Sequence, residues 1–402
     1  MKNLEEQFSE NLSITFGNER QFPSSEREHS NPIPVDLLID IFSRLPRKSI
    51  DRFRCVSKFW GYILRRPDFT ELFLTRSSTC PRLFFTVIAD GKLFFYSLPQ
   101  PQNPDDNSTL VATRYHTSFP EYFPYSFCSS VCGLVLLQGG LERKVRMICN
   151  PITGEFLTLP KVKTKSNPAT KVKDEIARIS LCYDPISKQF KVLCMTSSPR
   201  KRPTTHHQVL TLESGKRSWR RIECKFRFRD ISILYDEICI NGVLYFRAKM
   251  RKSPVIVCFD VGSEKFDFIK IDEDMLGDFG YCFTGHLALF NYKGKLGLRN
   301  RSGFSDTHKF VLWVVEDAGN HKWSKHTYEL PSLIRDNPWF VGMTAAGETV
   351  WSSYKNDPKP FFLDLYNLER ETFTRVNIQG FEEFKRRTIH TFLDSVENLK
   401  FV

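Results

Sequence analysis

Hydrophobic and polar positions follow three different patterns along the chain. Residues 1–31 are mostly polar with scattered apolar positions, a composition typical of a disordered tail. Over residues 32–76 apolar side chains recur every three or four positions, which predicts amphipathic helices. Over residues 80–402 they gather in short runs rich in β-branched and aromatic side chains, separated by Gly, Pro, Asn and Asp, which predicts strands. The chain is therefore expected to hold a disordered tail, a small all-α module and a large all-β domain.

The helical segment is predicted to form three short helices. The first begins near Pro34, whose missing N–H costs nothing in a first turn, and it ends at Pro46. Ser49 is expected to cap the second helix, and the third ends at the sequence RRPDF, before one further turn. The apolar stripes of the three helices carry Leu37, Leu38, Ile41 and Leu45, then Ile50, Phe53 and Val56, then Trp60, Ile63 and Leu64.

These apolar side chains are too many for so small a module to bury. Three helices of about 35 residues in all keep much of their surface exposed, because small domains bury a small share of it. The surplus apolar surface is expected to be an interface with another polypeptide. Trp60 is the predicted energetic anchor, since large aromatic side chains dominate such interfaces.

A hairpin motif repeats through the β segment. An Asn, Asp or Glu is followed six residues later by Phe or Trp, with turn-forming residues between them. The copies are NPITGEF (150–156), DPISKQF (184–190), ESGKRSW (213–219), DVGSEKF (260–266), DAGNHKW (317–323) and NLERETF (367–373). The first side chain is expected to hydrogen-bond to the backbone of its own turn, and the aromatic residue to anchor the returning strand.

A second repeated phrase places Gly before an apolar strand, as in VCGLVLL, INGVLYF and YKGKLGL. We interpret that strand as the inner strand of a propeller blade. The hairpin motifs lie about 30 to nearly 60 residues apart, which overlaps the period of four-stranded blades. The predicted architecture is an irregular β-propeller of about six blades, and a pair of stacked β-sandwich domains is the alternative.

Charge and cysteine content narrow the class of protein. The formal net charge is +12, from 58 Lys and Arg against 46 Asp and Glu, which favours an acidic partner or a nucleic acid. The 11 cysteines are spread through apolar stretches without a C-x-x-C pair, as free thiols are in reducing compartments. A secretory signal and an apolar run of membrane-helix length are both missing. We therefore expect a protein of the cytoplasm, the nucleus or both, without a membrane partner.

Patterns of catalytic or metal-ligating residues are also missing from the sequence. It has no G-x-S-x-G, P-loop or G-x-G-x-x-G motif. Its histidines, including the pair His206–His207 in a predicted loop, stand without Cys or carboxylates at ligand spacing. We expect no catalytic residue, metal or cofactor. A glycan-binding or oxidase propeller with Tyr and Trp in its pocket is an alternative, although core packing accounts for aromatic side chains in general.

Two parts of the sequence resemble known families. The stretch IPVDLLIDIFSRLPRKSIDRFRCVSKFWGYILRRPDFTELFL resembles an F-box, and the remainder resembles the F-box-associated domain of plant F-box proteins, a kelch-like or galactose oxidase-like propeller. The second resemblance rests on VCGLVLL, NPITGEFLTLP and YDPISKQFKVL. F-boxes commonly begin with Leu-Pro, and Ile33 preserves the apolar volume of that Leu. The first resemblance rests on Ile33–Pro34, Leu37–Leu38, Ile41, Leu45–Pro46 and the phrase from Arg52 to Trp60.

The resemblance implies a non-catalytic substrate receptor of an SCF-type ubiquitin ligase. Its F-box docks on a Skp-type adaptor, which links it indirectly to a cullin and a ring-finger subunit. The β domain then binds a target protein for ubiquitination, and the sequence does not identify that target. Carried over position by position, the adaptor-binding residues are Pro34, Leu37, Leu38, Ile41, Leu45, Pro46, Ile50, Val56, Ser57, Trp60 and Leu64.

A basic nucleic-acid-binding protein is the main rival interpretation. Lys and Arg outnumber Asp in the helical segment, as they do in a helix-turn-helix. Within residues 34–66 the cations are Arg44, Arg47, Lys48, Arg52, Arg54, Lys58, Arg65 and Arg66, against Asp36, Asp40 and Asp51. A recognition helix offers Arg, Asn or Gln to base edges, whereas the candidate face here holds Phe and Trp. The cations are therefore expected to complement an acidic adaptor. The basic stretch KFRFR (225–229) alternates like an edge strand with a cationic face. Charges that block pairing with another sheet account for this pattern, and contact with a ligand is the alternative.

Overall fold

The computed structural model describes most of the chain after residue 32. The described residues are 33–102, 105, 107–115, 125–139, 146–162, 175–197, 204–213, 215, 217–230, 237–276, 287–300, 309–335, 339–353 and 360–400. The predicted disordered tail, residues 1–31, lies outside them. The chain divides into two compact units, residues 1–45 and residues 46–402, and each is described by itself.

The first unit contains helix α2 (Val35–Ser43). Three helices open the second unit: α3 (Arg47–Val56), α4 (Lys58–Ile63) and α5 (Pro67–Thr79). The prediction that Ser49 caps the second helix is wrong, because α3 begins directly after Pro46, whose carbonyl oxygen accepts from Ser49 N. Proline fixes a backbone angle that suits a helix start, so the helix begins three residues earlier than the hydroxyl indicates. Helix α5 is longer than the single turn that the sequence indicates.

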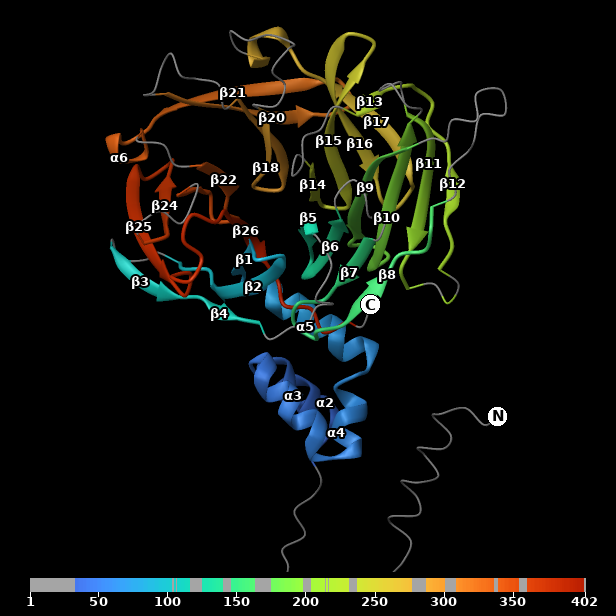
Figure 1. Ribbon diagram of the computed structural model, residues 1–402, viewed down its shortest axis with the longest axis vertical. Helices are drawn as coiled ribbons and strands as arrows, with labels where there is room; N and C mark the ends of the chain where they lie inside the picture. Colours follow the sequence, from blue (N-terminus) through green and yellow to red (C-terminus); the bar gives the residue numbers. More distant parts are fainter. Residues whose placement is uncertain are drawn as a thin grey trace, which may run out of the picture. The chain divides into compact units, whose positions relative to one another are not determined.

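The strands of the second unit form six sheets, which confirms a β-propeller of six blades (Figure 1). Blade 1 contains β26 (Ile389–Ser395), β1 (Arg82–Ala89), β2 (Lys92–Pro99) and β4 (Thr113–Arg114). Blade 2 contains β5 (Tyr125–Val131), β6 (Leu134–Gly139), β7 (Arg146–Cys149) and β8 (Phe156–Thr158). Blade 3 contains β9 (Glu175–Asp184), β10 (Gln189–Ser197), β11 (Thr204–Thr211) and β12 (Arg220–Ile222). The sheets are antiparallel apart from one pairing described below.

Blades 4 to 6 follow in chain order. Blade 4 contains β13 (Arg229–Asp230), β14 (Glu237–Ile240), β15 (Val243–Met250), β16 (Ser253–Asp260) and β17 (Lys265–Lys270). Blade 5 contains β18 (Leu287–Tyr292), β19 (Lys295–Asn300), β20 (Lys309–Asp317) and β21 (Lys322–Glu329). Blade 6 contains β22 (Trp339–Met343), β23 (Glu348–Ser352), β24 (Phe362–Asn367), β25 (Thr372–Gln379) and β3 (Ser108–Val111). Two short helical turns, η1 (Glu273–Leu276) and α6 (Ser332–Arg335), lie between blades. The core is built between adjacent sheets, as where Phe228, Phe246 and Phe259 are fully buried between blades 3 and 4.

Two strand exchanges close the ring. The C-terminal strand β26 pairs antiparallel with β1 as the innermost strand of blade 1, and the two lie side by side in Figure 1. Strand β3 leaves blade 1 and pairs in parallel with β25 of blade 6. The pairings join segments about 310 and about 270 residues apart, so each of these blades is completed by a strand near the other end of the domain.

Most of the repeated hairpins behave as the sequence predicts, although Phe156, the aromatic residue of NPITGEF, is 48% exposed. Five of the six join the third and fourth strands of a blade, and DPISKQF joins the first and second strands of blade 3. Asp184 Oδ1 accepts from Ile186 N at 3.0 Å, and Asn367 Oδ1 accepts from Glu369 N at 3.0 Å. Glu213 differs, because its carboxylate accepts from Phe190 N across the blade. The interpretation of the strand after Gly as the inner strand of a blade is wrong. In VCGLVLL the Gly precedes the second strand of the blade, which lies next to the innermost strand.

Alternating strand directions give the propeller two chemically different faces. The hairpin face carries the first-to-second and third-to-fourth turns, among them residues 132–133 and 150–155, and the C-terminal segment 395–400. The connection face carries the second-to-third turns and the links between blades, among them residues 223–228 and 251–252. Because β1 begins where β26 ends, with Arg82 opposite Ser395, the chain from α5 enters the propeller on the hairpin face.

The C-terminal segment ties the hairpin face together. Asn398 Nδ2 donates to Cys132 O at 2.9 Å, and Leu399 is fully buried. Glu397 N donates to Ser77 Oγ of α5 at 2.6 Å, and Glu71 of α5 forms an ion pair with Lys188 in a blade 3 turn. Helix α5 is thus fixed to the propeller by contacts at both of its ends.

Gly133→Ala is expected to destabilise the protein more than Gly91→Ala. Both glycines have positive φ, +79° and +73°, so both substitutions cost about 1 kcal/mol in backbone strain. A Cβ at Gly133 would also lie 2.6 Å from Val396 O, whereas nothing lies within 4 Å of one at Gly91. We expect a loss of about 3 kcal/mol for Gly133→Ala, measured as the free energy of unfolding in urea. Equal losses for the two variants would contradict the contact with the C-terminal segment.

Candidate adaptor-binding surface

Helix α2 has two apolar stripes, and one of them is exposed. Leu38 and Phe42, four residues apart, are buried at 6% and 3% exposure. Leu37 and Ile41 lie one position earlier on the helix and are exposed at 55% and 47%. Ile33, which lies just before the N-cap Pro34 and outside the helix, is also exposed. A surface helix normally places polar side chains opposite its buried stripe, so the exposed stripe of α2 has the character of an interface.

Helices α3 and α4 meet at a second group of exposed apolar side chains. Val56, the last residue of α3, is 62% exposed, and Phe59 in α4 is 39% exposed. Ser57 caps α4 by accepting from Trp60 N at 3.1 Å. The Trp60 ring packs edge-on against Phe53, with centroids 5.4 Å apart, and remains partly exposed. The short capped helix therefore holds two adjacent aromatic residues at the surface.

The predicted adaptor-binding residues fall into three groups by exposure. Pro34, Leu37, Ile41, Pro46, Val56 and Ser57 are exposed, Leu45 and Trp60 are partly exposed, and Leu38, Ile50 and Leu64 are buried. The buried three present almost no surface to a partner in this conformation. Contact of the other eight with an adaptor stays a prediction.

Two exposed apolar residues were missing from the predicted set. Ile33 directly precedes Pro34, the N-cap of α2, and adds an exposed apolar side chain next to the start of the helix. Phe59 adjoins Trp60 on a six-residue helix, where two neighbouring side chains cannot point to the same side. The position of Ile33 before the helix and that of Phe59 next to Trp60 can both be read from the sequence. Each would have enlarged the predicted adaptor-binding surface.

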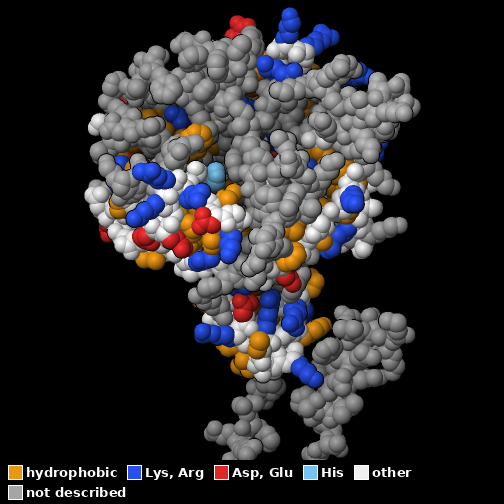
Figure 2. Space-filling view, viewed as in Figure 1, with side chains coloured by type: hydrophobic (Ala, Val, Ile, Leu, Met, Phe, Trp, Pro, Cys, Tyr) orange, Lys and Arg blue, Asp and Glu red, His pale blue; other side chains and the backbone are white. Residues whose placement is uncertain are grey.

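Part of the positive charge of the helical segment is compensated within it. Asp40 pairs with Arg44 at 2.9 Å, and Asp51 lies 3.3 Å from Arg47 and 3.8 Å from Arg54. Burial lowers the pKa of Arg54, whose guanidinium also donates to Leu64 O at 3.0 Å and so holds the end of α4. Among the described side chains, the exposed Arg52, Lys58 and Arg65 form no ion pair. Figure 2 shows Lys and Arg interspersed with hydrophobic side chains on the helical part.

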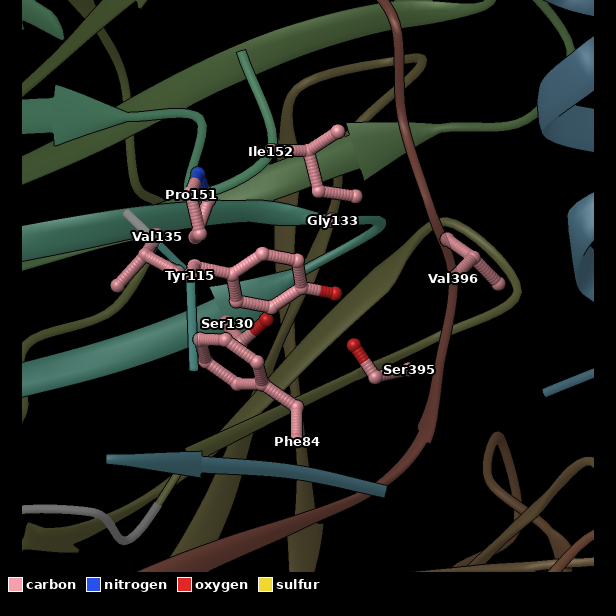
Figure 3. A pocket seen from close by; sticks show the side chains of 9 residues that line it. All are labelled: Phe84, Tyr115, Ser130, Gly133, Val135, Pro151, Ile152, Ser395 and Val396. Atoms are coloured by element: carbon pink, nitrogen blue, oxygen red, sulfur yellow. The ribbon is translucent and has the colours of Figure 1, made fainter. Parts of the chain in front are cut away.

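A small cavity lies under the C-terminal segment, and it is too small for a ligand. Phe84, Tyr115 and Ser130 line it from blades 1 and 2, facing Ser395 and Val396 (Figure 3). Its volume of about 10 Å³ leaves room for about one water molecule at most. Burial raises the pKa of Tyr115, whose hydroxyl accepts from Ser97 Oγ at 2.7 Å. We interpret the cavity as an imperfection in packing between blades and C-terminal segment.

The described residues contain no cluster of three His, Cys, Asp or Glu side chains that could hold a metal ion. The prediction that His206–His207 lies in a loop is wrong, because both residues belong to β11. The His207 ring is buried and stacks on Phe228 with centroids 5.6 Å apart, so it is a core residue. None of the described helices combines the length and hydropathy needed to cross a membrane.

Comparison with known proteins agrees with this architecture. The family model of the F-box associated beta propeller domain matches residues 82–396, and the F-box domain model matches residues 32–72. A putative F-box protein of Arabidopsis thaliana is 48% identical over all of both chains. F-box protein DOR of Arabidopsis thaliana is 42% identical over 98% of this chain and 99% of its own.

This chain is an F-box protein with an F-box associated β-propeller domain. Among solved structures, TolB from Acinetobacter baumannii is similar to it with a TM-score of 0.44 and 10% identity, over 77% of this chain and 66% of TolB. The domain pair and the relatives support a general role of this F-box protein in substrate recognition for SCF-type ubiquitin ligases. F-box proteins are in general non-catalytic adaptor subunits.

Proposed function

We propose that this F-box protein binds a Skp-type adaptor through its helices and a target protein through its propeller. The observation that carries the proposal is the exposed stripe of Leu37 and Ile41 on a helix that already buries Leu38 and Phe42. So much apolar surface on a short helix is stabilised when a partner covers it. Val56 and Phe59 add apolar surface to which the same adaptor would bind, and Arg52 and Lys58 favour an acidic one.

The adaptor would link the protein to a cullin and a ring-finger subunit, and those subunits would supply the ubiquitin-transfer chemistry. This F-box protein would act in the cytoplasm, the nucleus or both, without a cofactor. Its target would bind on the connection face of the propeller. The regular turns occupy the hairpin face together with α5 and the C-terminal segment, whereas the connection face carries the less regular links such as residues 223–228. Recognition in proteins of this kind is usually carried by such loops.

Reconstitution with purified subunits tests this proposal. The full chain, mixed with a purified Skp-type adaptor, is expected to co-elute with it from a size-exclusion column. Addition of the cullin and ring-finger subunits with a ubiquitin-conjugating enzyme should then yield ubiquitin conjugates on the F-box protein itself. Omission of the adaptor should abolish these conjugates. Separate elution at micromolar concentrations, or ubiquitin transfer by the F-box protein and conjugating enzyme alone, would overturn the proposal.

A further inference from the structure

Two basic segments lie side by side on the connection face of blade 4. The first follows β12, and the second is the turn from β15 to β16. They are joined by antiparallel pairing of β13 with β15, in which Arg229 is opposite Lys249. We call this the blade 4 basic surface, and it consists of Lys225, Arg227, Arg229, Lys249, Arg251 and Lys252. Six cations thus occupy two short segments that hold Glu223 and Asp230 as their acidic residues.

The charges on this surface are largely uncompensated. Lys225, Arg227, Arg251 and Lys252 are exposed, and among the described residues none of the four has an ion-pair partner. Two cations in hairpin-face turns are compensated, by contrast: Lys188 pairs with Glu71, and Lys293 pairs with Glu369. Like charges held together repel one another, and a ligand of opposite charge relieves that repulsion.

Aromatic packing fixes the first basic segment in place. The prediction that residues 225–229 form an edge strand is wrong, because only Arg229 belongs to a strand. Phe228 is fully buried, and Phe226 packs edge-on against Phe268 with centroids 5.1 Å apart. The alternating cations therefore project from an anchored backbone, and a ligand would meet an ordered array of charges.

We propose that the blade 4 basic surface binds an acidic segment of the target protein, rich in Asp and Glu. The inference rests on the proposed function, and it names the chemistry of the ligand on the connection face. A nucleic acid fits less well. Single strands are held by aromatic rings that stack on bases, and the rings of this surface, Phe226 and Phe228, are engaged in packing between blades. Carboxylates of an extended peptide need only reach the exposed cations.

Fluorescence anisotropy with a labelled peptide tests the inference. The probe is a fluorescein-labelled decapeptide of alternating Glu and Gly, and the full chain is titrated into it at low and at moderate salt. The test variant Lys225→Glu/Arg251→Glu reverses two charges of the surface. The control variant Lys265→Glu/Lys322→Glu reverses two exposed cations at the starts of β17 and β21, next to hairpin-face turns, and changes the net charge by the same amount. Both variants are checked by thermal melting.

We expect the test variant to bind the peptide at least tenfold more weakly than the wild type, and the control variant to bind within twofold of it. Added salt should weaken peptide binding by the wild type and reduce the difference in affinity between the wild type and the test variant. The inference would be overturned if both variants bound the peptide equally weakly, or if the test variant bound it as the wild type does. It would also be overturned if the same residues bound a labelled single-stranded oligonucleotide more tightly than the peptide. Both variants should bind the Skp-type adaptor as the wild type does. A measurement of adaptor binding therefore tests the proposed function separately from this inference about the peptide.

Discussion

Leu37→Asp is expected to weaken binding of the F-box protein to a Skp-type adaptor at least 100-fold. The side chain of Leu37 is 55% exposed on the apolar stripe of α2, so an adaptor that covers the stripe would bury a carboxylate there. Burying an unpaired charge costs several kcal/mol, and each 1.4 kcal/mol is about a tenfold change in affinity. Isothermal titration calorimetry of the full chain with the purified adaptor measures the change directly.

Ile186→Asp is the matched control for this variant. Ile186 is 91% exposed in a turn on the hairpin face of blade 3, so the substitution is chemically similar and lies outside the helices. It should leave adaptor affinity within twofold of the wild type. Because both side chains are exposed, neither variant should lower the melting temperature by more than a few degrees. Wild-type affinity in Leu37→Asp would show that the exposed stripe of α2 does not bind the adaptor.

Local chemistry explains which parts of the fold could be predicted. The hairpins of the propeller depend on contacts within a few residues, such as Asp184 accepting from Ile186 N, and the sequence motif reports them directly. The helices were recognised by spacing, but spacing alone does not show which of two adjacent stripes is buried. Leu37 and Leu38 therefore looked equivalent in the sequence, although one is exposed and the other is buried.

Long-range pairings explain most of what could not be predicted. Arg82 is opposite Ser395, and Ile378 is opposite Leu110. The sequence near these residues does not indicate which distant residues they pair with. The alternating pattern of residues 225–229 was misread for a related reason. Phe226 and Phe228 pack against blade 4, and this tertiary contact, not a strand, produces the alternation.

Rigid attachment of the helices matters for the proposed function. A receptor must hold its target at a defined position relative to the ligase, so the joint between α5 and the propeller should resist bending. The C-terminal segment forms that joint by bonding to Ser77 of α5 and to the turn at Cys132. Asn150 is the residue that holds the segment from the propeller side. Its Nδ2 donates to Asn398 O at 2.8 Å and to Lys400 O at 3.1 Å, and the residue is fully buried.

Asn150→Asp should therefore break the attachment and leave the turn intact. The Oδ1 of Asn150 accepts from Ile152 N at 3.0 Å, and Asp performs the same task in the turn at Asp184. The lost amide donors, however, would leave a buried carboxylate facing two carbonyl oxygens. We expect a loss of about 4 kcal/mol in the free energy of unfolding, measured by urea titration.

Asn367→Asp makes the same substitution in the hairpin of blade 6, where Asn367 accepts from Glu369 N and Arg370 N of its own turn. This control should cost about 0.5 kcal/mol or less, because an Asp oxygen accepts those bonds equally well. Limited proteolysis then locates the damage: Asn150→Asp should expose the C-terminal segment to cleavage, and Asn367→Asp should not. Similar losses in the two variants would show that Asn150 serves its turn alone. The segment from Glu397 to Lys400 would then owe its position to Leu399 and Asn398, and the joint with α5 would depend on packing more than on hydrogen bonds.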